Sequence, residues 1–282
     1  MTAASVPVDL TPPRPAWRSL LWTIPITALW TLLIYWQPGI PASAVPITAL
    51  RLMIHGLIAL GLWLGLERTD LTPSQRRTTW LAIMIPYTLW VGIAWSAAIN
   101  GVFRPGALPI RVPLAPLAIF LPVIIGAPLL LLSKRVGRLL DAMPATWLVT
   151  LQLSRVFGSV FLGAWLIGQA PGMFAVPAGI GDVLTGLFAV PAALAVAADT
   201  AQGRRAGINW NIFGLADYAV AITMGMITAA GPLQLIATSV PNIAALSYPT
   251  VLIPAYAVPS GILLHLLSLR QLRRRSEAAG LR

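Results

Sequence analysis

The sequence contains no cysteine, a single lysine and few charged residues of either sign. Without cysteine the chain can form no disulfide, thiolate metal site, iron–sulfur cluster or cysteine nucleophile. The one lysine, Lys134, lies between two apolar stretches rather than inside one, which excludes a retinal photoreceptor. Only 10% of the 282 residues are charged, whereas a typical soluble domain has about 25%.

Apolar residues are abundant instead, at 57% of the chain, and the mean hydropathy is +0.81. Apolar runs of about 20 residues are long enough to cross roughly 30 Å of hydrocarbon. The chain has eight of them, at approximately 17–36, 46–66, 79–100, 113–133, 146–168, 176–198, 208–229 and 247–269. The sequence therefore predicts an all-α, polytopic integral membrane protein with eight transmembrane helices, whose main partner is the lipid bilayer.

Basic residues are concentrated in every second loop. If those loops are cytoplasmic, they hold fifteen of the nineteen basic residues: Arg14, Arg18, Arg68, Arg76, Arg77, Lys134, Arg135, Arg138, Arg204, Arg205, Arg270, Arg273, Arg274, Arg275 and Arg282. The remaining loops hold Arg104 and Arg111 alone. The positive-inside rule then predicts that both termini are cytoplasmic. It also accounts for the net charge of +11, so no nucleic-acid partner is expected.

Eight spans divide into two sets of four, and a direct repeat is compatible with that topology. A shift of about 130 residues aligns "QPGIPASAVP" (37–46) with "QAPGMFAVP" (169–177) and places Arg51 opposite Asp182. We predict a disordered cytoplasmic tail at 1–16, four-helix repeats at 17–135 and 144–270, and a basic cytoplasmic tail at 271–282. Cleavage after Ala42-Ser43-Ala44 is the alternative for the first span, although that apolar run is longer than a signal peptide requires.

Four charged residues fall inside the predicted spans, two of each sign. Each costs about 2.5–3.5 kcal/mol at mid-membrane and is expected to face the bundle interior. The polar residues near them complete a candidate substrate or proton pathway: Gln152, Arg155, Asp182, Asn209, Asn211 and Asp217, with Arg51 and His55 as candidate charge partners. In this interpretation Arg155 holds an anionic group of the substrate or the counter-charge, and an aspartate changes protonation. The alternative is that the charges form salt bridges that only tie helices together.

The other polar and helix-breaking residues give weaker signals. His265 is expected at the cytoplasmic interface and His55 in hydrogen-bonding contact with Arg51, and neither has metal-ligand spacing. No nucleotide or other cofactor motif occurs, so neither a metal nor a cofactor is expected. Three prolines each in the fourth and eighth spans predict breaks in those two helices. Gly179, Gly181 and Gly186 are expected to serve helix packing around Asp182.

The segment "GIGD" (179–182) matches the G-x-G-D signature of intramembrane aspartyl proteases, the presenilin and signal-peptide-peptidase group. In that group a tyrosine–aspartate span precedes the G-x-G-D span, whereas here Asp217-Tyr218 follows it in reversed order. The proline–alanine–leucine element near the C-terminus is also missing. The motif therefore stands without its context, and we expect Asp182 to be an electrostatic partner of Arg51 or Arg155 rather than a proteolytic acid.

Three segments, "QLSRVFGSVFL" (152–162), "GQAPGMFAVPAGIGDVLTG" (168–186) and "WNIFGLADYAVA" (210–221), resemble a family of uncharacterised bacterial multi-pass membrane proteins. The resemblance covers mainly residues 150–270 and implies a place in the bacterial cytoplasmic (inner) membrane, but no activity. The polar pathway favours a small-solute or proton-coupled transporter, or a receptor for a small ligand. A membrane-embedded enzyme and a structural subunit remain alternatives, and the substrate and the oligomeric state stay open.

Overall fold

The computed structural model describes residues 45–107, 109 and 112–280. The first expected span, 17–36, lies outside the described residues, as do the N-terminal tail and its two arginines. Within the described part the fold is all-helical, with seven helices or broken helices long and apolar enough to cross a membrane. In chain order the elements are α2 (Val45–Glu67), α3 (Pro73–Ile99), α4 (Leu114–Leu132), α5 (Lys134–Ala142), α6 (Thr146–Leu151), η2 (Gln152–Ser159), α7 (Val160–Leu166), α8 (Gly172–Ala197), α9 (Ala201–Thr228), η3 (Ala244–Leu246), η4 (Ile253–Ala257) and α10 (Val258–Ala278).

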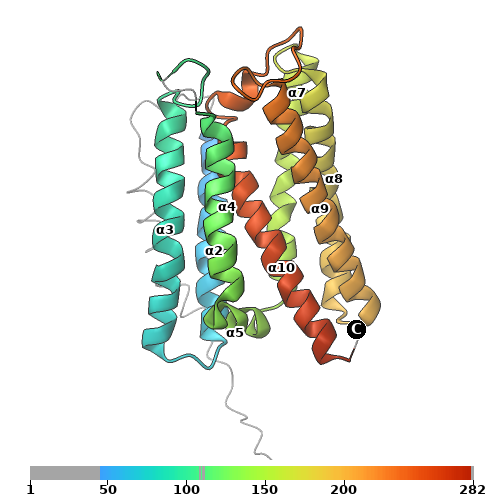
Figure 1. The fold of residues 1–282 in the computed structure, drawn as a ribbon. Helices are drawn as coiled ribbons and strands as arrows, with labels where there is room; N and C mark the ends of the chain where they lie inside the picture. The colour runs from blue at the N-terminus through green and yellow to red at the C-terminus, as the bar shows by residue number, and fades with distance from the viewer. Residues whose placement is uncertain (1–44, 108, 110–111, 281–282) are drawn as a thin grey trace, which may run out of the picture.

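The helices form two groups with α10 between them (Figure 1). One group holds α2, α3 and α4, and the other holds α8, α9 and the broken span α6–η2–α7. Helix α10 crosses obliquely between the groups and contacts α4 on one side and α9 and α6 on the other. It has the largest buried share of the seven spans, and α4 has the smallest.

Outward-facing side chains of these spans are large and apolar, including Ile93, Ile124, Leu129 and Leu194. Only helices and closed barrels can satisfy all backbone polar groups in hydrocarbon, and a surface of this kind is stable against lipid tails. The chain is therefore a helical membrane protein. Basic loops, including the α2–α3 loop, α5 and the end of α10, lie at one end of the bundle (Figure 1). That distribution agrees with the predicted orientation, whereas the side of each terminus and the internal repeat stay predictions.

Local signals explain where several helices begin. Thr72 caps α3 in a reciprocal capping box with Gln75, and Pro73 occupies the first turn, where its missing N–H costs nothing. Ser133 and Thr200 cap α5 and α9 with a single bond, in which the side-chain oxygen accepts from a backbone N–H three residues later.

The short helix α5 lies at the basic end of the bundle and buries Val136, Leu139 and Leu140. Helix α10 is fastened to it, because the Gln271 side chain donates to the carbonyls of Leu140 and Met143. These bonds satisfy carbonyls at the C-terminal end of α5, which has no further helical turn to accept them.

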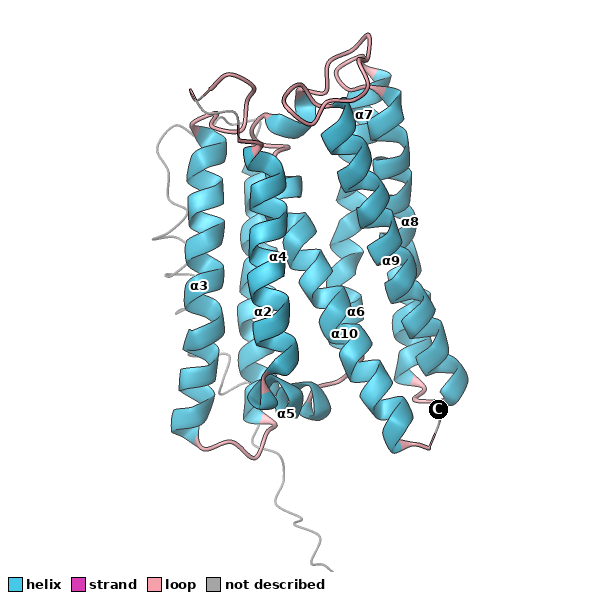
Figure 2. Ribbon diagram, viewed as in Figure 1, coloured by secondary structure: helices cyan, strands magenta, loops and turns pink. Residues whose placement is uncertain are grey.

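Two spans depart from α-helical geometry, one in its middle and one at its start. Residues Gln152–Ser159 form a 3₁₀ segment of eight residues between α6 and α7, and Ile253–Ala257 form a π-helical segment before α10. A 3₁₀ segment of this length inside a helix is uncommon and often marks a hinge, and π segments often mark functional sites. Figure 2 labels α6 and α7 at the two ends of the first of these spans.

These breaks differ in part from the expected ones. The predicted break in the eighth span is present at Pro254, but α4 is assigned as one continuous helix despite Pro122 and Pro128. The fifth span is broken although it contains no proline. The eighth span is also displaced: it covers Ile253–Ala278 rather than 247–269, because the chain before it forms an irregular connection that includes η3.

Candidate functional site

Arg155 lies at the centre of the site, on the 3₁₀ segment η2. Its side chain is 3% exposed and forms ion pairs with two carboxylates from two different helices. Its Nε donates to Asp182 Oδ1 of α8 at 2.8 Å, and its Nη2 donates to the Asp217 carboxylate of α9. Nη1 donates to the Gly214 carbonyl at 3.1 Å. The expectation that Asp182 pairs with Arg155 is confirmed, and the second carboxylate makes this a three-way ion cluster.

His265 of α10 completes this group, which we call the Arg155 cluster: Arg155, Asp182, Asp217 and His265. The Arg155 Nη1 lies 3.1 Å from His265 Nε2, and a guanidinium can only donate. Nε2 is therefore the accepting nitrogen, and Nδ1 carries the proton toward Asn211 Oδ1 at 2.8 Å. The Asn211 amide donates in turn to Ser268 Oγ at 3.0 Å. These bonds fix His265 as a neutral imidazole in one tautomer.

The location of His265 corrects the sequence prediction, which placed it at the cytoplasmic interface. It is completely buried and contacts the central guanidinium. The prediction was wrong because the eighth span was expected to end near 269, whereas α10 continues to Ala278 and brings His265 to the middle of the helix.

Glycines make room for the polar side chains of the cluster. A Cβ on Gly158 would overlap the Asp182 carboxylate, and one on Gly181 would overlap the Asp217 carboxylate. A Cβ on Gly214 would collide with the His265 ring. The glycines of the "GIGD" segment thus serve close packing, as expected: Gly181 admits Asp217, and Gly179 lies against Leu162. Close approach of backbones through small residues is the usual device of membrane helices.

Aromatic rings enclose the cluster. The Arg155 guanidinium carbon lies 3.6 Å from the centroid of the Tyr218 ring, a geometry in which a cation is attracted to the ring face. The Trp210 ring lies 5.0 Å from His265 and donates its N–H to the Thr185 carbonyl at 3.1 Å. These rings shield the charges from lipid and from bulk water.

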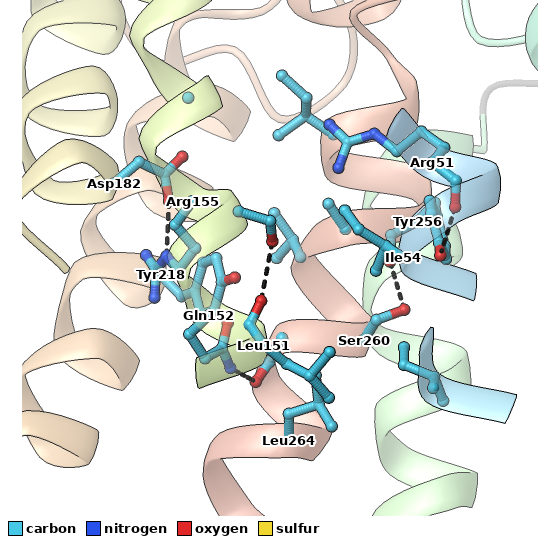
Figure 3. A pocket seen from close by; sticks show the side chains of 17 residues that line it. Arg51, Ile54, Leu151, Gln152, Arg155, Asp182, Tyr218, Tyr256, Ser260 and Leu264 are labelled. Carbon is cyan, nitrogen blue, oxygen red and sulfur yellow. Dashed lines mark hydrogen bonds and ion pairs between the residues drawn. The ribbon is translucent and has the colours of Figure 1, made fainter. Parts of the chain in front are cut away.

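A cavity of about 40 Å³ adjoins the cluster, lined by polar groups from η2, α8, α9, α10 and α2. Arg51 lines it from α2, on the side opposite Arg155 and Asp182 (Figure 3). Both non-α segments contribute to its wall, through Gln152 and Ser154 of η2 and Tyr256 of η4. Gln152 donates to the Gly261 carbonyl at 2.9 Å and so ties η2 to α10.

Arg51 is buried, with 5% exposure, and forms no ion pair within the described part of the chain. Its Nε has no hydrogen-bond partner, and its nearest aromatic contact is Tyr256, whose ring centroid lies 5.9 Å from the guanidinium carbon. Arg51 was predicted as a charge partner, and it does reach the same cavity as Asp182. It nevertheless has no counter-ion among the residues that the structure describes.

Two other predicted members lie apart from the cluster. His55 forms a hydrogen bond with Thr88 Oγ1 at 3.1 Å and stacks on Tyr87 with ring centroids 5.0 Å apart, so it links α2 to α3. The predicted hydrogen bond to Arg51 is not among the contacts of the described residues. Asn209 is exposed on α9 and does not join the site, which corrects its inclusion in the pathway. Its neighbour Asn211 is fully buried and bonds to His265.

The model of one protein family matches residues 112–273 of the chain, with the description "Domain of unknown function (DUF8737)". The chain belongs to this family. Searches of curated proteins and of solved structures give no match. The DUF8737 region begins just before α4 and ends within α10, so it contains the whole Arg155 cluster, Gln152 and Asn211. Arg51 and His55 lie outside it, on α2.

Proposed function

We propose that this DUF8737 protein carries a small solute with an anionic group across the membrane, through the cavity between Arg51 and the Arg155 cluster. The supporting observation is Arg51 itself. A buried charge without a partner is costly, and ionisable residues inside a membrane are functional candidates by default. A bound anion would supply the counter-charge that the described chain does not.

Arg155 was expected to hold the anion, and the geometry favours a different role. Its Nε and both terminal nitrogens already donate to Asp182, Asp217 and the Gly214 carbonyl. We therefore assign Arg155 the positioning of the two carboxylates, and we assign anion binding to Arg51.

Charge balance provides a basis for proton coupling. The Arg155 cluster contains one guanidinium, two carboxylates and a neutral imidazole, so it carries one excess negative charge when both aspartates are ionised. Arg51 balances that charge across the cavity. An anion on Arg51 removes the balance, and a proton on one carboxylate restores it. A low-dielectric interior penalises the unbalanced state strongly, so anion and proton would bind together.

The helix breaks supply the parts that could move. The 3₁₀ segment η2 carries Arg155, the π segment η4 carries Tyr256, and both line the cavity. Discontinuous helices around a midplane binding site are a common arrangement in transporters. The basic loops favour an orientation with the α5 end in the cytoplasm, and the resemblance to bacterial multi-pass membrane proteins favours the cytoplasmic membrane of a bacterium.

A receptor for the same solute is the second candidate, because the cavity would serve binding without transport equally well. The protease alternative has less support, since Arg155 donates to both carboxylates, whereas an aspartyl dyad shares a proton between its two acids.

Uptake by proteoliposomes tests the proposal. We expect at least one of a panel of radiolabelled small carboxylates (glycolate, lactate, 3-methylbutanoate and L-valine) to show saturable uptake that is lost in Arg51→Met. The exposed arginine Arg273 on α10 gives the matched control Arg273→Met, which should retain uptake. A pH-sensitive dye inside the vesicles reports the accompanying proton. Binding without uptake would identify a receptor, and the absence of any Arg51-dependent binding or uptake would refute the proposal.

A further inference from the structure

A second cavity of about 70 Å³ adjoins the polar one and is lined almost entirely by apolar side chains. The two cavities share Asp182, Tyr218, Ile253 and Val258 in their walls. Asp182 therefore stands where the first cavity, which we call the polar chamber because charged Arg51 and Asp182 line it, meets an apolar chamber. The apolar walls come from α4, α7, α8, α9 and the segment before α10, and include Phe161, Phe174, Ile222 and Met226.

The polar chamber presents two opposite charges that do not pair with each other. Arg51 forms no ion pair within the described residues, and its Nε has no partner. Asp182 uses Oδ1 for Arg155, while its other oxygen packs closely against Gly158, and both residues line the cavity. Figure 3 shows Arg51 and Asp182 on opposite sides of the cavity.

We infer that the solute is a small apolar α-amino acid or a closely related zwitterion. Its carboxylate binds Arg51, its ammonium group donates to Asp182, and its side chain occupies the apolar chamber. This inference rests on the proposed function and specifies its substrate class. The ammonium group supplies the positive charge that a proton would otherwise provide, so a zwitterion leaves the charge balance of the site intact.

The size of the apolar chamber limits the side chain. A cavity of about 150 Å³ holds benzene, which has six carbons, and the apolar chamber is about half as large. It has room for about three carbons, the number in the side chain of valine. The chamber beside Arg51 is smaller, about 40 Å³, so the breaks at η2 and η4 have to widen it to admit the carboxylate and the ammonium group. Each carbon from glycine to valine should tighten binding by about fourfold, and phenylalanine should be excluded.

Removing one charged group from the ligand tests the inference on the wild-type protein, so no variant has to fold. The probes are L-valine, 3-methylbutanoate, which lacks the ammonium group, and L-valinamide, which lacks the carboxylate. Equilibrium binding in detergent and uptake by proteoliposomes are measured for all three. We expect L-valine to bind at least tenfold more tightly than either analogue, without proton uptake.

The chamber itself is tested by Ala221→Leu, since Ala221 lines the apolar cavity. This variant should weaken the binding of L-valine at least tenfold and leave the binding of glycine nearly unchanged. The control, Ala219→Leu on the exposed face of α9, should bind both amino acids as tightly as the wild type. Equal weakening of glycine and L-valine would overturn the placement of the side chain.

The remaining outcomes separate the two proposals. Binding of 3-methylbutanoate as tight as that of L-valine, with proton uptake and Arg51 dependence, would overturn the zwitterion and leave the anion carrier standing. Tight binding of L-valinamide independent of Arg51 would overturn both. If none of the three probes binds, the zwitterion inference fails, and the carrier proposal is decided by the other carboxylates of the uptake panel.

Discussion

Removing the Arg155 guanidinium should destabilise the protein far more than removing the whole charge cluster. In Arg155→Met the methionine fills part of the space, but Asp182 and Asp217 lose their charged hydrogen-bond donor. Such bonds contribute about 1.5–3 kcal/mol each, and stranding one member of a buried pair costs about 3–5 kcal/mol. Because one guanidinium here serves two carboxylates, we expect the free energy of unfolding to fall by about 5 kcal/mol, the upper end of that range. At about 2–4 °C per kcal/mol for a chain of this order of size, the melting temperature should fall by on the order of 10–20 °C.

Compensating substitutions in the two aspartates should restore stability in steps. Adding Asp182→Asn to Arg155→Met removes one stranded carboxylate and should recover about half of the loss. Adding Asp217→Asn as well leaves no charge in the cluster and should recover most of it, because neutral replacement of buried ion clusters is often tolerated. The assay is thermal unfolding of the detergent-purified protein. The fraction that stays folded is measured by size-exclusion chromatography of a fluorescent fusion.

An exposed ion pair supplies the control. Arg138 and Asp70 lie 3.5 Å apart with side chains 45% and 75% exposed, so Arg138→Met should change stability by less than about 1 kcal/mol. If Arg155→Met were as stable as Arg138→Met, or if the single, double and triple variants melted together, the carboxylates would not be held by Arg155 and the cluster described here would be wrong.

Three further results are expected. Arg51→Met should lose solute binding while lowering the melting temperature much less than Arg155→Met, because Arg51 balances the cluster only across the cavity and forms no direct ion pair within the described residues; a loss as large as that of Arg155→Met would instead indicate a structural role. Gly158→Ala, which forces a methyl group onto the Asp182 carboxylate, should lower the melting temperature, whereas Gly163→Ala, which meets nothing within 4 Å, should not; equal behaviour would contradict the packing. Alkaline phosphatase fused after Gly168 should be active and a fluorescent protein at the C-terminus should fluoresce, and the reverse pattern would invert the topology.

The spans were predictable because hydropathy and length are local properties. Each of the seven spans in the described residues overlaps a predicted one, and the error is concentrated where tertiary structure sets the boundary. The eighth span is displaced because residues 247–252 belong to the connection before η4. This mixed segment, Ser-Tyr-Pro-Thr-Val-Leu, runs directly into the apolar helix, so hydropathy alone does not show where the helix begins. The 3₁₀ segment around Arg155 has no proline to predict it.

The site was predictable in its charges and not in its geometry. Orphan charges in a membrane must find partners, which was enough to predict the Arg155–Asp182 pair. Helical periodicity could have separated the two asparagines, because residues three or four apart share a face. Asn211, Gly214 and Asp217 follow that spacing and all lie in the site, whereas Asn209 does not and is exposed. Whether His265 belongs to the site depends on how far α10 extends, and no local sequence pattern indicates that length.

The four intramembrane charges form a neutral set only when both halves of the cavity are counted. Arg155 alone cannot neutralise two carboxylates, and Arg51 has no direct counter-ion among the described residues, so each side of the cavity carries an unbalanced charge by itself. A structural ion pair needs no cavity between its members, and pairing Arg51 directly with Asp182 would remove the imbalance at no cost in space. The structure instead keeps Arg51 across a polar cavity from a carboxylate that is already shared. That separation is what a binding site for a small charged solute requires, and it is the physical reason for preferring a carrier over a helix-tying ion cluster.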